Sequence, residues 1–279
     1  MEVLVVGNTA YVDDDFCAKA FPGDHVQVVA AAEARRDESS PHASWKELLQ
    51  HLDQAYEFDR VVYLSNYLTP HTDTVGDIET LRSVFRACAG RRVQLLYVAG
   101  PAGAEGAADA AGRTGKGIIA RAANDLCRYY AAREGVQTKI LRVPFLYTAS
   151  AALEDPFLVP LFDACSTGSV ALQGAQDATF PLLCAEELAV LVRRIFDSWD
   201  ASFETLDVAD TFHHASGEVG EALKALFPGL SVAYGDSAGY ALPASDVARV
   251  RYGWFQRYDL LRDLSTIQAR WDAGRAKKV

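Results

Sequence analysis

Short apolar runs alternate with segments of helical periodicity along the first half of the chain. The runs predict buried strands at residues 3–6, 26–30, 61–64, 93–98 and 139–143. Between them, apolar residues recur every three or four positions, which predicts helices at residues 14–20, 44–56, 72–89 and 118–133. Residues 100–117 are rich in glycine and alanine and predict a loop. Strands and helices that alternate at this spacing form a parallel sheet covered on both faces.

The first strand and the turn after it organise this sheet. The apolar run ends at Gly7, a short turn follows, and a helix is predicted to begin at Asp13, Asp14 and Asp15. This order is typical of a Rossmann-type fold. We therefore predict an α/β protein with a doubly wound parallel sheet over residues 1–150. After Pro144 the pattern changes to shorter, mixed elements, so residues 151–279 are predicted to form a smaller C-terminal α/β region that completes the cleft.

Charge and composition exclude several classes of function. The formal net charge of −10 argues against nucleic-acid binding, which depends on Lys and Arg. No apolar run approaches the roughly 20 residues of a membrane helix, so no membrane association is expected. No basic and apolar leader precedes Val3, and the five cysteines lack paired spacing, which favours a cytoplasmic protein with reduced, mostly buried thiols.

Five segments, in the same order, resemble the extended short-chain dehydrogenase/reductase family, the NAD-dependent epimerases and dehydratases. They are residues 3–12, 61–66, 139–147, 182–189 and 246–264. The resemblance implies a Rossmann fold, an NAD(P) cofactor, and a homodimer through the helices at residues 72–89 and 118–133. The family's catalytic groups are a Ser or Thr, and a Tyr followed four residues later by a Lys.

None of these catalytic groups is found at its expected place. The family spacing puts Lys116 at the Tyr position and Ala120 at the Lys position, and residues 99–104 contain no Ser or Thr. A hydroxyl that polarises a carbonyl group is therefore missing. Lys116 remains the candidate catalytic residue, as a desolvated base or Schiff-base amine. The alternative is a solvated loop lysine beside Arg113.

The predicted cofactor turn also departs from the family pattern. Gly7 is present, but Ala10 and Asp13 occupy the positions of the family's two further glycines. The second glycine lets the backbone approach the pyrophosphate, and the third lets the helix pack close to the strand. Two like charges about 5 Å apart repel by roughly 3 kcal/mol at an effective dielectric of about 20. Alternatively, the aspartates cap the helix and occupy its dipole. The candidate cofactor-binding residues, by position, are Gly7, Asn8, Thr9, Ala10, Tyr11, Val12, Tyr63, Leu64 and Ser65.

We therefore expect no cofactor at physiological concentration, and NAD(P) if any dinucleotide binds. The second strand does not end in an acidic residue that could bind the adenosine ribose of NAD. Arg35 and Arg36 are candidates for binding the 2′-phosphate of NADP; alternatively, they are solvated loop charges. We expect no metal site, because His213 and His214 would point to opposite faces of a strand. Cys184 is interpreted as a core residue rather than a nucleophile.

Two classes of function remain open from the sequence. The first is a Rossmann protein that has lost hydride transfer and acts as a binding, regulatory or partner-subunit protein, as a homodimer or with another protein partner. The second is an enzyme, either a divergent NAD(P)-dependent reductase, epimerase or dehydratase, or one that uses the old cleft for other chemistry on a small molecule. Binding of NAD(P) distinguishes them.

Overall fold

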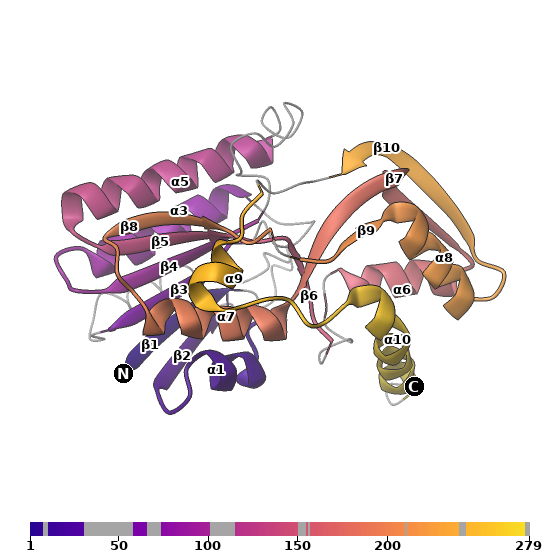
Figure 1. Cartoon of the computed structure of the whole chain (residues 1–279), viewed down its shortest axis with the longest axis horizontal. Helices are drawn as coiled ribbons and strands as arrows, with labels where there is room; N and C mark the ends of the chain where they lie inside the picture. Colours follow the sequence, from indigo (N-terminus) through magenta and orange to yellow (C-terminus); the bar gives the residue numbers. More distant parts are fainter. Residues whose placement is uncertain are drawn as a thin grey trace, which may run out of the picture.

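The computed structural model describes residues 1–7, 11–30, 58–65, 74–100, 115–149, 155, 157–209, 211–239 and 244–276. Within these ranges the chain forms two lobes, a larger N-terminal one and a smaller one around two long strands (Figure 1). The predicted helix at residues 44–56 lies outside the described residues. No helix in the described ranges is long and apolar enough to cross a membrane.

The larger lobe is built on a parallel sheet. Among the described residues it has six strands in the order β2-β1-β3-β4-β5-β8. The strands are β1 (Glu2–Gly7), β2 (His25–Ala30), β3 (Arg60–Leu64), β4 (Gln94–Ala99), β5 (Gln137–Arg142) and β8 (Phe203–Asp207). Each of the five strands predicted from apolar runs is present, and all neighbouring pairs are parallel. The prediction of a Rossmann-type α/β sheet is confirmed.

Helices cover both faces of this sheet (Figure 1). They are α1 (Asp14–Ala20) and α7 (Ala185–Asp197) on one face, and α3 (Thr74–Cys88) and α5 (Gly115–Glu134) on the other. Successive strand residues point to opposite faces, so Val3 and Val5 pack with α1 and α7, whereas Leu4 and Val6 pack with α3 and α5. Burial on both faces explains why the strands are continuous apolar runs.

The prediction of a loop at residues 100–117 was wrong for residues 115–117, because α5 already begins at Gly115. Lys116 therefore lies in the first turn of a helix rather than in a loop. Gly115 and Gly117 have low helix propensity, which tertiary packing commonly overrides. Here α5 packs along α3 over the sheet, and Tyr130 stacks on Phe85 with ring centroids 4.7 Å apart.

The smaller lobe has a second, four-stranded sheet among the described residues. The strands and helices of the smaller lobe are β6 (Phe145–Tyr147), α6 (Leu158–Ser166), β7 (Ser169–Cys184), β9 (His213–Ala215), α8 (Ser216–Leu226), β10 (Ser231–Gly239) and α10 (Leu260–Ala276). We expected only short elements here, but β7 has 16 residues. Over residues 169–180 most of its residues are partly or fully exposed, and only the last four, residues 181–184, form a continuous buried run.

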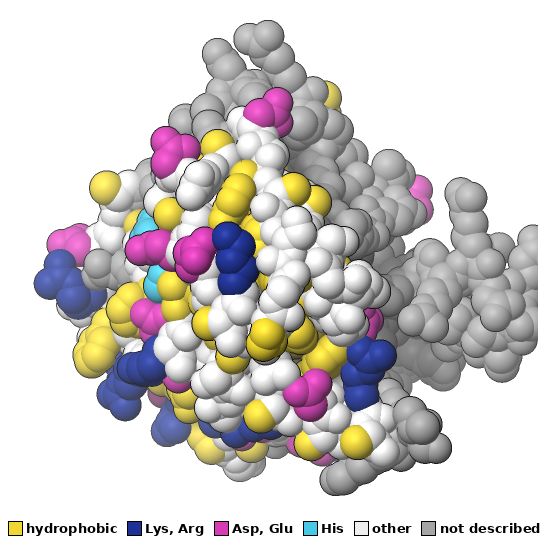
Figure 2. Space-filling model, turned by 90° about the vertical axis from the view of Figure 1, so that its right-hand side faces the viewer, with side chains coloured by type: hydrophobic (Ala, Val, Ile, Leu, Met, Phe, Trp, Pro, Cys, Tyr) yellow, Lys and Arg dark blue, Asp and Glu magenta, His cyan; other side chains and the backbone are white. Residues whose placement is uncertain are grey.

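The chain crosses between the lobes more than once after Pro144. α7 packs against α1, β8 is the sixth strand of the large sheet, and α9 (Val247–Tyr252) lies beside α7 and β8. Residues after the predicted boundary at 150 thus contribute to both lobes. The smaller lobe shows a surface on which acidic, basic and hydrophobic side chains are interspersed (Figure 2).

Candidate functional site

The C-terminal edge of the large sheet holds the first candidate residues. Gly7 ends β1, and a Cβ atom there would lie 2.9 Å from Cβ of Leu64, at the end of β3. A glycine is therefore required for these strands to pack, whether or not a ligand approaches. Val12 is buried beside it. Asn8, Thr9 and Ala10 lie outside the described residues.

Asp13 is the N-cap residue of α1. Its Oδ1 accepts a hydrogen bond from the backbone N–H of Phe16 at 2.7 Å, and its backbone is extended, as expected of an N-cap. The interpretation of this aspartate as a helix cap is confirmed. The thiol of Cys17 lies near this charge. Its pKa is raised to about 11, first by burial and then by Asp13 and Asp14.

Two candidate positions at the end of β3 are tied to a buried carboxylate on α3. The hydroxyl of Tyr63 donates to Oδ1 of Asp77 at 2.7 Å, and the hydroxyl of Ser65 donates to Oδ2 at 2.8 Å. All three side chains are buried, and burial together with Asp77 raises the pKa of Tyr63 well above its usual value. These hydroxyl groups stabilise Asp77. The sequence did not indicate Asp77, because a lone aspartate in a helix is usually solvated.

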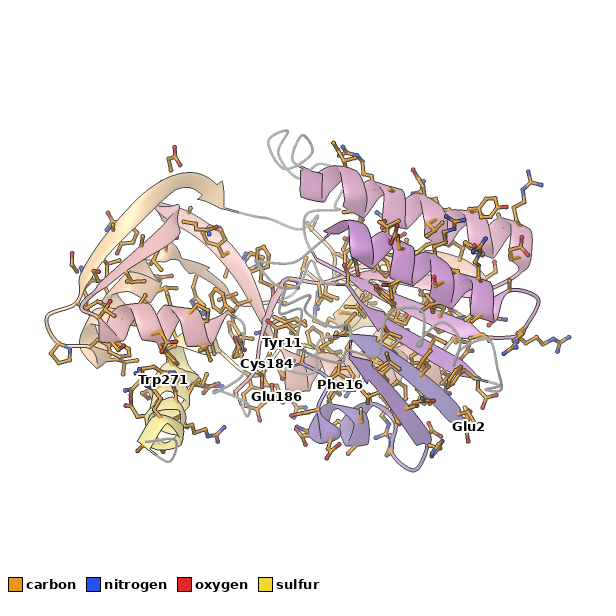
Figure 3. The ribbon with its side chains drawn as sticks, turned by 180° about the vertical axis from the view of Figure 1, so that it is seen from behind. Glu2, Tyr11, Phe16, Cys184, Glu186 and Trp271 are labelled. Atoms are coloured by element: carbon orange, nitrogen blue, oxygen red, sulfur yellow. The ribbon has the colours of Figure 1, made fainter. Side chains whose placement is uncertain are left out.

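Tyr11, another candidate, connects the turn after β1 to the smaller lobe. It is buried, and its hydroxyl donates to the carbonyl oxygen of Leu146 in β6 at 3.2 Å. Figure 3 shows Tyr11 close to Cys184 and Glu186, where the two lobes meet. This contact orients the side chain toward β6 and gives Tyr11 a structural role between the lobes.

The positions that the resemblance assigns to catalysis lie on α5 and at the end of β4. Lys116 lies in the first turn of α5, and Ala120 is buried one turn further along. Ala99, the last residue of β4, is buried, while residues 101–104 lie outside the described ranges, as do Arg35 and Arg36. At the end of β5, Arg142 forms a paired hydrogen bond with Asp207 of β8 through Nε at 2.6 Å and Nη2 at 2.7 Å.

A buried polar network joins β6, β7 and α7. The thiol of Cys184 donates to Oε2 of Glu186 at 2.6 Å, and the hydroxyl of Thr148 donates to Oε1 at 3.1 Å. Burial, followed by Glu186, raises the pKa of the Cys184 thiol, so the thiol is not activated as a nucleophile. Its burial supports its interpretation as a core residue. The backbone N–H of Thr148 donates to Asp155, whose pKa burial raises to about 6.

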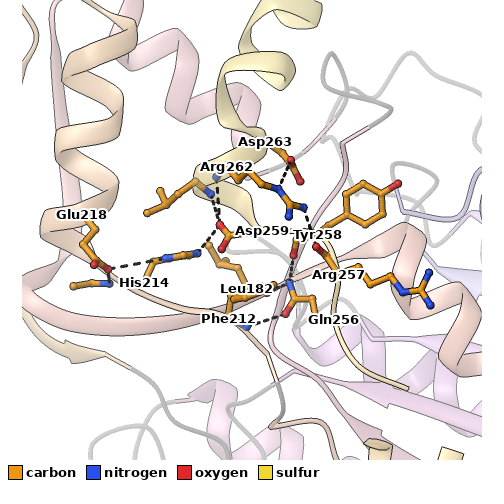
Figure 4. Close-up of polar contacts among 12 residues, drawn as sticks. Leu182, Phe212, His214, Glu218, Gln256, Arg257, Tyr258, Asp259, Arg262 and Asp263 are labelled. Atoms are coloured by element: carbon orange, nitrogen blue, oxygen red, sulfur yellow. Dashed lines mark hydrogen bonds and ion pairs between the residues drawn. The ribbon is translucent and has the colours of Figure 1, made fainter. Parts of the chain in front are cut away.

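The neighbouring Glu187 fixes the segment before α10. Its carboxylate accepts the backbone N–H groups of Arg257 and Tyr258 at 2.8 and 3.0 Å, and burial raises its pKa. Next to it, the Gln256 side chain donates to the carbonyl oxygens of Leu182 and Tyr258 (Figure 4). The sequence motif at residues 182–189 thus anchors the chain between the lobes.

The histidine pair has separate environments. His213 is exposed, whereas Nε2 of His214 lies 3.1 Å from Oδ1 of Asp259 (Figure 4). They lie on β9, where adjacent side chains point to opposite faces. Among the described residues, no group of three His, Cys, Asp or Glu side chains has the arrangement of a metal site. The five cysteines, all within those residues, are free thiols, four of them buried.

A cavity of about 220 Å³ lies between α1 and α10. Asp15 and Lys19 line it from α1, Glu186 lines it from the start of α7, and Asp263 and Arg270 line it from α10. No sequence pattern indicated this cavity, because it joins residues far apart along the chain.

The fold is that of several solved nucleotide-sugar dehydratases and epimerases. The chain is similar to a dTDP-glucose 4,6-dehydratase from Streptomyces venezuelae solved with NAD and TYD bound, with a TM-score of 0.73 and 13% identity over 97% of this chain and 96% of that one. It is also similar to a UDP-glucose 4-epimerase from Thermotoga maritima with UDP-glucose, with a TM-score of 0.74 and 12% identity over 99% and 100%. At such identities the likeness establishes the fold. No protein-family model and no curated protein sequence matches the chain.

Proposed function

We propose that this chain is a Rossmann protein of the extended dehydrogenase/reductase fold that does not perform the hydride transfer of such enzymes and acts as a binding, regulatory or partner-subunit protein. One observation carries the proposal: the carboxylate of Asp13 accepts the N–H of Phe16 at the N-terminus of α1. In dinucleotide-binding Rossmann folds, this helix end faces the pyrophosphate. A built-in anion competes with a bound one there.

The groups expected for catalysis add support. The position that the resemblance assigns to the catalytic Lys is Ala120, a buried methyl group, and the Tyr position is Lys116. Tyr63 and Ser65, near the predicted cleft, already donate their hydroxyl hydrogens to Asp77. We therefore expect no turnover of sugar nucleotides with NAD(H) or NADP(H).

The alternative is an enzyme that binds NAD(P) in an altered way, either a divergent reductase, epimerase or dehydratase, or one with other chemistry in the same cleft. Its support is the fold, since several similar structures were solved with NAD. In that case Lys116 is the first residue to substitute.

Titration with NAD⁺, NADH, NADP⁺ and NADPH separates the two proposals. A dinucleotide present at 100 times its dissociation constant stabilises a protein by about 2.7 kcal/mol. Thermal unfolding followed by fluorescence detects such a change, and calorimetry gives the affinity. No shift with any of the four supports the non-catalytic proposal, whereas micromolar binding of one of them contradicts it.

We also propose that the chain forms a homodimer through α3 and α5. Ile118 and Tyr129 lie on α5 with 55% and 54% of their surface exposed. Positions 118 and 129 are eleven residues, about three turns, apart, so both lie on one side of the helix, where one partner surface can cover them. The same helices were predicted to form the dimer interface by resemblance.

A further inference from the structure

The cavity between α1 and α10 is lined by charges of both signs. Three carboxylates, Asp15, Glu186 and Asp263, share it with two cations, Lys19 and Arg270. A nucleotide or another anion would face three carboxylates there, and a simple cation would face two positive groups. The charge distribution suits a molecule that carries one positive and one negative group.

Arg270 has hydrogen-bonding capacity left for an anion. Its Nη1 donates to the carbonyl oxygen of Ala149 at 2.6 Å. In the described part of the chain no carboxylate pairs with this guanidinium, which has five N–H donors in all. The planar group is suited to bind a carboxylate with two parallel hydrogen bonds.

Asp263 offers the opposite charge on the same helix. Its Oδ1 accepts from Nε of Arg262 at 3.2 Å, but its Oδ2 is buried without a hydrogen-bond partner among the described residues. The hydroxyl of Tyr147, which is completely buried, also has no partner there, and Asp263 is one of the charges that raise its pKa, after burial and Cys184. Buried polar atoms in proteins nearly always have a partner.

The two groups are placed to hold both ends of one small molecule. Residues 263 and 270 are seven positions apart, about 10 Å or two turns along one face of α10. Helical side chains lean toward the N-terminus, so the long side chain of Arg270 shortens the gap to Asp263. Between them Ile267, which also lines the cavity, provides a buried apolar surface.

We propose that this cavity binds a small zwitterion of the α-amino acid class, with the ligand's carboxylate on Arg270 and its ammonium group on Asp263. Lys19, held by Asp15 on α1, completes the wall on the side of the larger lobe. A bound ligand therefore contacts both lobes and links α1 to α10. The proposed ligand is a small zwitterion rather than a dinucleotide, so the inference goes beyond the function proposed above.

Isothermal calorimetry with the proteinogenic L-amino acids, added singly to the full-length protein, tests the proposal. We expect at least one to bind with saturation at millimolar concentration or below. Its methyl ester, which lacks the carboxylate, and its N-acetyl derivative, which lacks the ammonium group, should each bind roughly tenfold to hundredfold more weakly, as expected for the loss of a charge-assisted hydrogen bond. These two probes leave the protein unchanged.

Substitutions locate the site. Arg270→Gln and Asp263→Asn should weaken binding by a similar factor, whereas Arg275→Gln should not. Arg275 is the matched control, since it lies on the same helix and pairs with Asp163 outside the cavity. Three results would overturn the proposal. They are the absence of binding by every amino acid, an ester or N-acetyl derivative that binds as tightly as its parent amino acid, and a loss of affinity in Arg275→Gln as large as in Arg270→Gln.

Discussion

Asp13→Asn separates the charge of the N-cap from its hydrogen bond. In the native protein the Asp13 carboxylate accepts the N–H of Phe16 at 2.7 Å. Asparagine is an equally good N-cap, and its carbonyl oxygen accepts the same N–H. The substitution therefore keeps α1 in place and removes one negative charge from the point at which a pyrophosphate would approach.

The expected gain in dinucleotide affinity follows from Coulomb's law. Two unit charges about 5 Å apart repel by roughly 3 kcal/mol at an effective dielectric of about 20. This corresponds to roughly a hundredfold change in dissociation constant. Asp13 is half-buried, so solvent and salt screen part of the repulsion and make this an upper limit. The stability cost should be small, about 0.3–1 kcal/mol for losing an anion at a helix N-terminus.

Calorimetric titration with NAD⁺ and NADH, at low and at high ionic strength, measures the effect. The wild type should show no binding, and Asp13→Asn should bind measurably. The gain in affinity should be larger at low ionic strength, where the repulsion from Asp13 is less screened. Asp14→Asn is the matched control, because Asp14 carries the same charge in the first turn but is exposed and does not cap the helix. Adding Ala10→Gly to a change at Asp13 should increase the affinity further, since glycine permits closer approach of the backbone.

Two results would refute this reasoning. If the wild type binds NAD(H) or NADP(H) at micromolar concentration, the aspartates do not exclude the cofactor, and the enzymatic alternative is favoured. If Asp14→Asn increases affinity as much as Asp13→Asn, the effect comes from net charge rather than from the cap position.

Three further predictions concern stability and assembly. Asp77→Ala should lower the free energy of unfolding by about 2–3 kcal/mol in urea, because it leaves the buried hydroxyl groups of Tyr63 and Ser65 without their carboxylate partner; an unchanged midpoint would contradict this. Asp155 has a pKa of about 6 in the folded protein against 3.8 when unperturbed. The folded state therefore binds the proton more tightly, and about 3 kcal/mol of stability should be lost in all as pH rises from below 3 to above 7, most of it between about 4 and 6. The free energy of unfolding of Asp155→Asn should not show this decrease with pH. An equal decrease in the variant and the wild type would disprove the assignment of the effect to Asp155. Light scattering should report a dimer at tens of micromolar, and Ile118→Arg with Tyr129→Arg should convert it to a monomer; a wild-type monomer would remove the interface.

The sequence by itself determined those features that depend on neighbouring residues. The five predicted strands were correct because buried parallel strands need continuous apolar runs. The boundaries of α1 were correct because apolar residues recur every three or four positions in an amphipathic helix. The Asp13 cap was also predictable, since an N-cap side chain bonds a backbone N–H only three residues ahead. By contrast, the start of α5 at Gly115 was missed, because its local composition favours a loop.

Only the tertiary structure decided which distant groups meet. Asp77 follows Tyr63 by 14 residues and shows no distinguishing local pattern, yet the packing of α3 on β3 makes it the acceptor for two candidate hydroxyl groups. In the same way, β8 joins the large sheet after the chain has passed through the smaller lobe, and the cavity brings Lys19 together with Arg270. Propensity and periodicity act over a few residues. These contacts depend on how whole elements pack, and packing is set by the burial of entire faces at once.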